Sequence, residues 1–112
     1  MKFAKNSVIY KSTPLTEDLT RRARLLALAG DQTRIRILCF MFEYKQACVS
    51  EIAESLGMSV ASISQHLQVM RDNGFFVFER MGNKVCYILK KNEFIKDLEK
   101  VVCDSQLDKR IS

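Results

Sequence analysis

The chain has 112 residues, of which 47% are hydrophobic, and this fits one globular domain with a packed core and argues against disorder in its middle. The formal net charge of +5 favours a polyanionic partner, usually nucleic acid or a membrane surface. No apolar run approaches the roughly 18 residues that span a bilayer. The first residues also lack the apolar segment of a signal peptide, so we expect a cytoplasmic protein with no membrane partner.

Four cysteines, at positions 39, 48, 86 and 103, are spread along the chain, and no two of them form a CxxC pair. In a cytoplasmic protein, such cysteines more often bind metal, react with oxidants or stay inert than build a disulfide framework. The missing CxxC spacing argues against a zinc knuckle or a thioredoxin-type centre. We therefore expect no disulfide framework.

Residues 1–14 contain three lysines and no acidic residue, which predicts a basic N-terminal arm. A first helix is predicted over 16–30. Thr16 can accept hydrogen bonds from the first unpaired amides, and Gly30 suits the end of a helix.

The apolar residues of this first helix lie on two sides. Leu19, Ala23 and Leu26 share one face, whereas Leu25 and Leu28 lie well off it. A surface helix that is apolar on two sides usually buries both. In so small a chain, we expect the second side to be buried in a dimer.

Asp31 can cap the next predicted helix, over 32–45. The inward stripe of this helix is predicted to be Ile35, Leu38, Cys39 and Phe42. On this pattern alone, Cys39 is interpreted as a core residue. A short link over 46–49 follows.

Two further helices are joined across Gly57. Ser50 is predicted to cap the first, over 51–56, and the second runs over 60–73. Residues 75–89 are rich in β-branched and aromatic residues around the turn sequence MGNK, which predicts a two-stranded hairpin. Together these elements predict a mainly α-helical winged helix-turn-helix with a β-hairpin wing.

The second of these helices carries small and amide side chains opposite its apolar stripe of Ile63, Leu67 and Met70. Such side chains suit a DNA major groove, because glutamine pairs with adenine edges and serine with several bases or a phosphate. The predicted DNA-binding residues are Ser59, Ala61, Ser62, Ser64, Gln65, His66 and Gln68, with Arg80 and Lys84 of the hairpin. A merely solvated face would have a similar composition, and His66 suits packing or hydrogen bonding better than DNA contact.

A last helix is predicted from about Glu93, with Asn92 as its cap. Its apolar side is predicted to be Phe94, Leu98, Val101 and Val102. At 100° per residue, Cys103 falls on the opposite side, beside Lys96 and Lys100. A small buried hydrophobe is not expected there, and the two lysines would favour the thiolate form of Cys103.

Four motifs occur in order along the chain: TRIRIL, SxSQHLxxMR, GFF and RxGNKVxY. They resemble those of the ArsR/SmtB family of winged-helix repressors, from the first helix through Cys103. The resemblance implies a homodimer formed by the first and last helices, which binds a double-stranded DNA operator and releases it on binding an inducer. The DNA-binding and sensor domain would span 15–107, followed by a tail over 108–112. With one histidine, no nucleophile elbow and no phosphate-binding glycine loop, we expect no enzyme activity and no cofactor.

The resemblance also bears on the inducer, by which the family divides. The metal sites of the family are incomplete here: Cys48 matches the first thiol of one site, Ser50 replaces the second, and the last helix has no histidine. Cys39 and Cys103 match the two cysteines of the persulfide-sensing members. This match implies that the two face each other, and that their reaction with a persulfide or polysulfide, a small sulfur-species inducer, releases DNA.

Two alternatives stay open. Cys39, Cys48 and Cys103 could converge on arsenite or a soft cation such as cadmium, which needs two or three thiolates. A winged helix could also serve only for protein contacts. We interpret Cys86 as a packing residue and Cys48 as either inert or a third thiol.

Overall fold

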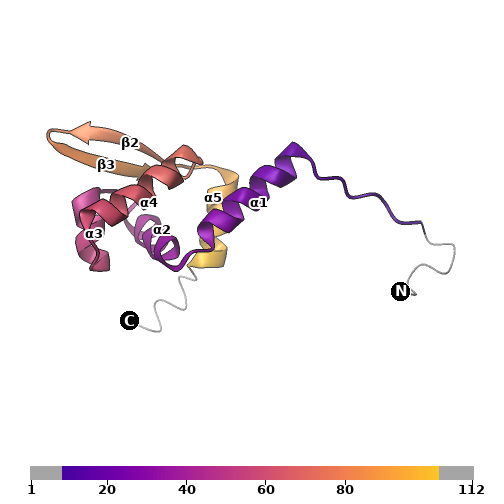
Figure 1. Cartoon of the computed structure of the whole chain (residues 1–112), viewed down its shortest axis with the longest axis horizontal. Helices are drawn as coiled ribbons and strands as arrows, with labels where there is room; N and C mark the ends of the chain where they lie inside the picture. Colours follow the sequence, from indigo (N-terminus) through magenta and orange to yellow (C-terminus); the bar gives the residue numbers. More distant parts are fainter. Residues whose placement is uncertain (1–8, 104–112) are drawn as a thin grey trace.

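Five helices and three strands follow one another within residues 9–103, the part of the chain that this computed structural model describes (Figure 1). The helices are α1 (Glu17–Ala29), α2 (Gln32–Tyr44), α3 (Val49–Leu56), α4 (Val60–Asp72) and α5 (Glu93–Val102). The strands are β1 (Gln46–Cys48), β2 (Phe76–Met81) and β3 (Lys84–Leu89). This order confirms the winged helix-turn-helix. None of the helices in this range is long and apolar enough to cross a membrane.

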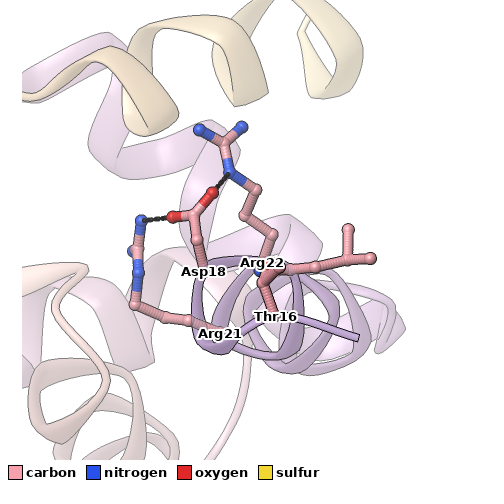
Figure 2. A network of polar contacts seen from close by, with 5 residues as sticks. Thr16, Asp18, Arg21 and Arg22 are labelled. Carbon is pink, nitrogen blue, oxygen red and sulfur yellow. Dashed lines mark hydrogen bonds and ion pairs between the residues drawn. The ribbon is translucent and has the colours of Figure 1, made fainter. Parts of the chain in front are cut away.

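α1 begins where its sequence predicts. Thr16 has an extended backbone, and its Oγ1 accepts a hydrogen bond from the Leu19 amide at 3.0 Å. Asp18 accepts hydrogen bonds from Arg22 Nε at 2.8 Å and from Arg21 Nη2 at 3.3 Å, as Figure 2 shows. These two guanidinium groups hold the pKa of the Asp18 carboxyl below its usual range, and the carboxylate also suits the positive end of the helix.

α2 is the central helix of the core, and it packs against α1, α3, α5, β1 and β3. Its buried residues are Ile37, Leu38, Met41 and Phe42. Leu38 and Phe42 agree with the predicted inward stripe, but Ile35 and Cys39 are only half-buried. The stripe is wrong at those two positions, because neighbours cover α2 on several sides and its buried surface is rotated toward Ile37 and Met41.

β1 lies where the sequence predicts only a link. It completes an antiparallel sheet in the order β1-β3-β2, with Cys48 directly opposite Cys86. Three residues are too few to show an alternating pattern. α3 then starts at Val49, and the backbone amide of its N-cap residue Cys48 donates to Glu51 Oε1 at 2.7 Å. The predicted cap at Ser50 is therefore wrong, because the strand leads directly into the helix.

The turn between α3 and α4 follows the prediction. Gly57 has the left-handed φ of 68°, and its amide donates to the Glu54 carbonyl while the Met58 amide donates to that of Ala53. β2 and β3 pair up to the hairpin tip, where Met81 lies opposite Lys84. Figure 1 shows the tip of this wing on the side of α3, while α1 extends from the other side of the fold.

Three of the four residues on the predicted apolar side of α5 pack against the core: Leu98 is buried, and Phe94 and Val102 are half-buried against it. Asn92 caps it as expected, with Oδ1 accepting from the Ile95 amide at 2.9 Å. Ile95 and Leu98 are buried. Val101, which the sequence places on the apolar side, is 81% exposed, so this assignment is wrong. Ile95 joins Leu98 in the core instead, because the core and not the pattern of the helix decides which apolar residue at the edge of this side is buried.

Candidate nucleic-acid interface and thiol pair

α4 presents its polar side away from the core. Ile63, Leu67 and Met70 are fully buried, as predicted, and hold the helix against the body. Among the predicted DNA-binding residues of α4, Ala61, Gln65 and Gln68 are exposed, and Ser62, Ser64 and His66 are half-buried. Ser59 is the N-cap residue, and its Oγ accepts a hydrogen bond from the Ser62 amide at 3.1 Å. The Ser59 oxygen therefore already stabilises the helix start.

A groove of about 480 Å³ lies between α4, the start of α3 and the wing, and we call it the wing groove. Its polar and basic lining consists of Ser50, Ser64, Gln68, Arg71, Arg80, Asn83 and Lys84. The fold thus brings together four of the predicted DNA-binding residues. Gln68 Nε2 donates to Ser64 Oγ at 3.2 Å, which orients the amide. Three cationic side chains beside hydroxyl and amide groups can pair with phosphates and base edges.

The other predicted residues of α4 do not line this groove. Gln65 and His66 line a separate hollow of about 330 Å³ together with Arg34 and Asp72. Gln68 lines both hollows, whereas Ser59, Ala61 and Ser62 line neither. The polar face of α4 is therefore divided between two sides of the helix.

Arg71 belongs to this surface and was missed at the sequence level. Its guanidinium carbon lies 4.6 Å from the centre of the Phe78 ring on β2, and its Nη2 pairs with Asp72 at 3.0 Å. The cation–π contact ties α4 to the wing. Arg71 is the arginine of the SxSQHLxxMR motif, and this position could have indicated its place on the DNA-binding surface. Its partner could not be inferred, because Phe78 meets α4 only once the wing has folded back.

Cys39 and Cys103 come together across α2 and the end of α5. Cys103 is the C-cap residue of α5: its amide still donates to the Glu99 carbonyl, at 2.8 Å, while its own backbone is extended. Its Sγ lies 2.9 Å from Sγ of Cys39. Both residues are half-buried, and Cys103 packs against the core. We call these two residues the thiol pair.

Cys48 and Cys86 form a disulfide between opposed positions of β1 and β3, which we call the cross-strand disulfide. This corrects the expectation that Cys86 only packs and that Cys48 is inert or a third thiol. Cys86 is indeed buried, at 4% exposure, but it is bonded as well. The bond was not foreseen because 38 positions separate the two cysteines and β1 itself was not predicted.

The cysteines of the metalloid alternative are not gathered into one set. The sulfur of Cys48 is held by Cys86 rather than by the thiol pair. Across residues 9–103, no three histidine, cysteine, aspartate or glutamate side chains are grouped in a way that could hold a metal ion.

α1 leaves an apolar surface uncovered in the single chain. Leu25 and Ala29 are buried against the core, whereas Leu19 and Leu26 are exposed on the other side of the helix. The preceding Leu15 is exposed too. The two-sided pattern of the sequence thus corresponds to one side packed in the chain and another facing outward.

Comparisons with known proteins agree with this architecture. Residues 31–75 match the family described as bacterial regulatory protein, arsR family. The chain is 31% identical over 84 residues to the HTH-type transcriptional regulator YgaV of Escherichia coli K12, covering 72% of this chain and 85% of YgaV. It is 30% identical over 66 residues to the arsenical resistance operon repressor of the same strain, covering 59% of this chain and only 56% of that repressor.

Among solved structures, HlyU from Vibrio cholerae N16961 is similar with a TM-score of 0.66 and 26% identity, over 80% of this chain and all of HlyU. A structure of reduced HlyU matches with a TM-score of 0.65, over 79% of this chain and 96% of HlyU. These relatives are regulators rather than enzymes. From its fold and these similarities, the chain belongs to the ArsR/SmtB family of winged-helix, DNA-binding transcriptional regulators.

Proposed function

We propose that the protein is a homodimeric repressor that leaves its DNA operator when the thiol pair, Cys39 and Cys103, reacts with a persulfide or polysulfide. The observation that carries this proposal is the 2.9 Å separation of the two sulfurs. A disulfide requires two sulfurs that can approach to about 2 Å, so little movement separates the thiol pair from a covalent bridge. The similarity to HlyU, of which a reduced form has been solved, supports a thiol-based response.

The DNA contacts of the proposal rest on α4 and the wing groove. Gln68 and Ser64 would read base edges, while Arg80 and Lys84 would neutralise phosphates. Ser59 and Ser62 stand at the N-terminal end of α4, where the helix dipole attracts phosphate. Gln65 and His66 would contact DNA from the side of the second hollow, and Ala61 would contact it from the exposed face of α4.

The dimer of the proposal uses the uncovered apolar surface. Leu19 and Leu26 of α1 and Val101 of α5 are exposed apolar side chains on the first and last helices. Pairing two copies through these helices would bury them and set the distance between the two α4 helices, as a two-half-site operator requires.

The reaction proposed to release DNA needs only the thiol pair and a polysulfide, which acts as the oxidant. The Cys103 thiolate attacks a terminal sulfur of tetrasulfide, one S–S bond of the tetrasulfide breaks, and trisulfide leaves while Cys103 becomes a persulfide. After this persulfide takes a proton from water, the Cys39 thiolate attacks the Cys103 sulfur and hydrosulfide leaves. The two cysteines lose two electrons, and the sulfur released as hydrosulfide accepts them.

The bridge would act on DNA binding through α2 and α5. Cys39 lies in the central helix, which also packs against α1 and α3, whereas Cys103 ends a helix of the proposed dimer. Closing the bridge changes how α2 and α5 pack and hence the spacing of the two α4 helices. A hundredfold loss of DNA affinity requires only about 2.7 kcal/mol of coupling.

The test begins with a fluorescent DNA duplex selected from a random-sequence pool by the protein whose thiol pair is reduced and whose cross-strand disulfide is intact. Anisotropy then gives the dissociation constant before and after treatment with sodium tetrasulfide. Wild type should lose about a hundredfold in affinity, whereas Cys39→Ser and Cys103→Ser should bind DNA but fail to respond. The matched control is the double variant Cys48→Ser/Cys86→Ser, which keeps the thiol pair and should still respond.

Two outcomes would overturn the proposal. Release of DNA by tetrasulfide-treated Cys103→Ser would show that the responsive cysteines lie elsewhere. Failure of the protein with a reduced thiol pair to select any duplex would contradict the proposed repressor function. Intact-mass spectrometry with arsenite in place of tetrasulfide tests the metalloid alternative. Arsenite retained by cysteines that include Cys48 would favour that alternative, for which the cross-strand disulfide would first have to be reduced.

A further inference from the structure

The cross-strand disulfide joins two parts of the DNA-binding surface. Cys48 ends β1 and is the N-cap residue of α3, the first helix of the helix-turn-helix. Cys86 lies in β3, the inner strand of the wing. One covalent bond therefore connects the start of the helix-turn-helix to the wing, and the thiol pair takes no part in it.

The two sulfurs of this bond differ in access. Cys48 is half-buried and lines the wing groove, whereas Cys86 is buried and is not part of the groove wall. Of the two cysteines, Cys48 is therefore the one that a thiol entering the groove meets. The same groove carries Arg71, Arg80 and Lys84, which would concentrate a negatively charged thiol at its mouth.

We propose that the cross-strand disulfide is a second reactive site, at which anionic thiols exchange with Cys48 and thereby remove the covalent link between the wing and the helix-turn-helix. The thiolate forms a bond with Cys48 Sγ, the Cys48–Cys86 bond breaks, and Cys86 leaves as a thiolate that takes a proton from water. A second thiolate then attacks the sulfur of the bound thiol, which forms the external disulfide and frees Cys48. Two electrons pass from the two thiols to the pair of cysteines.

Reduction would matter for DNA binding because it removes a constraint on the wing. In the bonded state, Arg80 and Lys84 are held at a defined place relative to α3 and α4. In the reduced state, only noncovalent contacts would position the wing: the pairing of β1 with β3, the Arg71–Phe78 contact, and the packing of β2 and β3 against the helices. Loss of preorganisation weakens binding, so we expect a several-fold loss of DNA affinity. This consequence rests on the proposed repressor function, whereas the exchange reaction does not.

The exchange reaction is tested without DNA, on a Cys39→Ser/Cys103→Ser background that removes the thiol pair. The disulfide protein is treated with 2-mercaptoethanesulfonate, which is anionic, or with 2-mercaptoethanol, its neutral counterpart. Alkylation and peptide mass spectrometry then follow the adducts with time. At low salt, the anionic reagent should react several-fold faster per thiolate, and the advantage should shrink at high salt or in the Lys84→Ala variant. Lys91→Ala, which removes a lysine outside the groove, should keep the advantage.

The first mixed disulfide should map to Cys48. An adduct that forms first on Cys86, equal rates for the two reagents, or an unreduced protein that lacks the Cys48–Cys86 bond would overturn the proposal. A bound duplex should slow the reaction at least several-fold, because the phosphate backbone would occupy the groove. If exchange proceeds as expected but DNA gives no protection, the exchange site stands and the assignment of the groove to DNA fails.

Discussion

The turn between α3 and α4 depends on one residue with a left-handed backbone, Gly57. Gly57 has φ of 68°, and a Cβ at this position would meet no atom within 4 Å. The left-handed backbone alone should therefore penalise Gly57→Ala, by about 1 kcal/mol in the free energy of unfolding. Urea denaturation measures the change. Gly30→Ala is the control, because Gly30 has φ of −79° and alanine should be tolerated there; an equal loss in both variants would contradict the argument.

The lowered pKa of Asp18 predicts a small loss of folding stability in acid. Its pKa is lower in the folded protein, so ionised Asp18 stabilises the fold above the unfolded pKa of about 3.9, and this contribution is lost as the pH falls through the lower folded value. The effect is small because the group is exposed. Urea midpoints of wild type and Asp18→Asn should differ slightly at pH 7 and converge in strong acid. Arg22→Gln should lower the urea midpoint at pH 7 by most of the same amount. A difference between wild type and Asp18→Asn that grows as the pH falls would contradict the predicted direction of the effect.

At the scale of elements, the wing supplies two of the three cationic side chains that line the wing groove, Arg80 and Lys84. Lys84 is exposed at the start of β3 and lines the wing groove. If it neutralises one phosphate, Lys84→Ala should weaken DNA binding across all sequences and reduce the salt slope by about one. Anisotropy titrations at several salt concentrations measure this slope. Lys91→Ala, beyond the other end of β3, should leave the slope unchanged. An unchanged slope in Lys84→Ala would show that Lys84 does not contact a phosphate.

The helix starts also show which features can be predicted from the local sequence pattern and which cannot. Helix starts with side-chain caps, such as Thr16 and Asn92, were predicted where they occur, because a cap depends on residues within one turn. The start of α3 was not predicted correctly, since it depends on β1, and β1 exists only through its pairing with β3. Val101 of α5 was wrongly assigned to the buried side for a related reason, because the core and not the helix decides which apolar residues at the edge of that side are covered.

At the scale of the whole molecule, the exposed apolar side of α1 predicts the oligomeric state. Leu26 is 56% exposed beside the buried side of the helix. Leu26→Glu would place a charge in the proposed dimer interface, and a buried unpaired charge is costly, so we expect a monomer that binds DNA at least tenfold more weakly. Light scattering after size exclusion measures the mass. Met81→Glu, at 57% exposure on the wing tip, should remain dimeric, whereas a dimeric Leu26→Glu protein would place the interface elsewhere.

The sequence by itself determined the fold class, the helix-turn-helix, the hairpin wing and the inward residues of α4, because each depends on periodicity or turn chemistry within a short segment. Only the tertiary structure decided which cysteines meet. Cys103 reaches Cys39 because α5 packs against α2, and Cys48 reaches Cys86 because an unforeseen strand pairs with the wing. Contacts between residues 64 and 38 positions apart are set by packing of distant segments, and no local pattern encodes them.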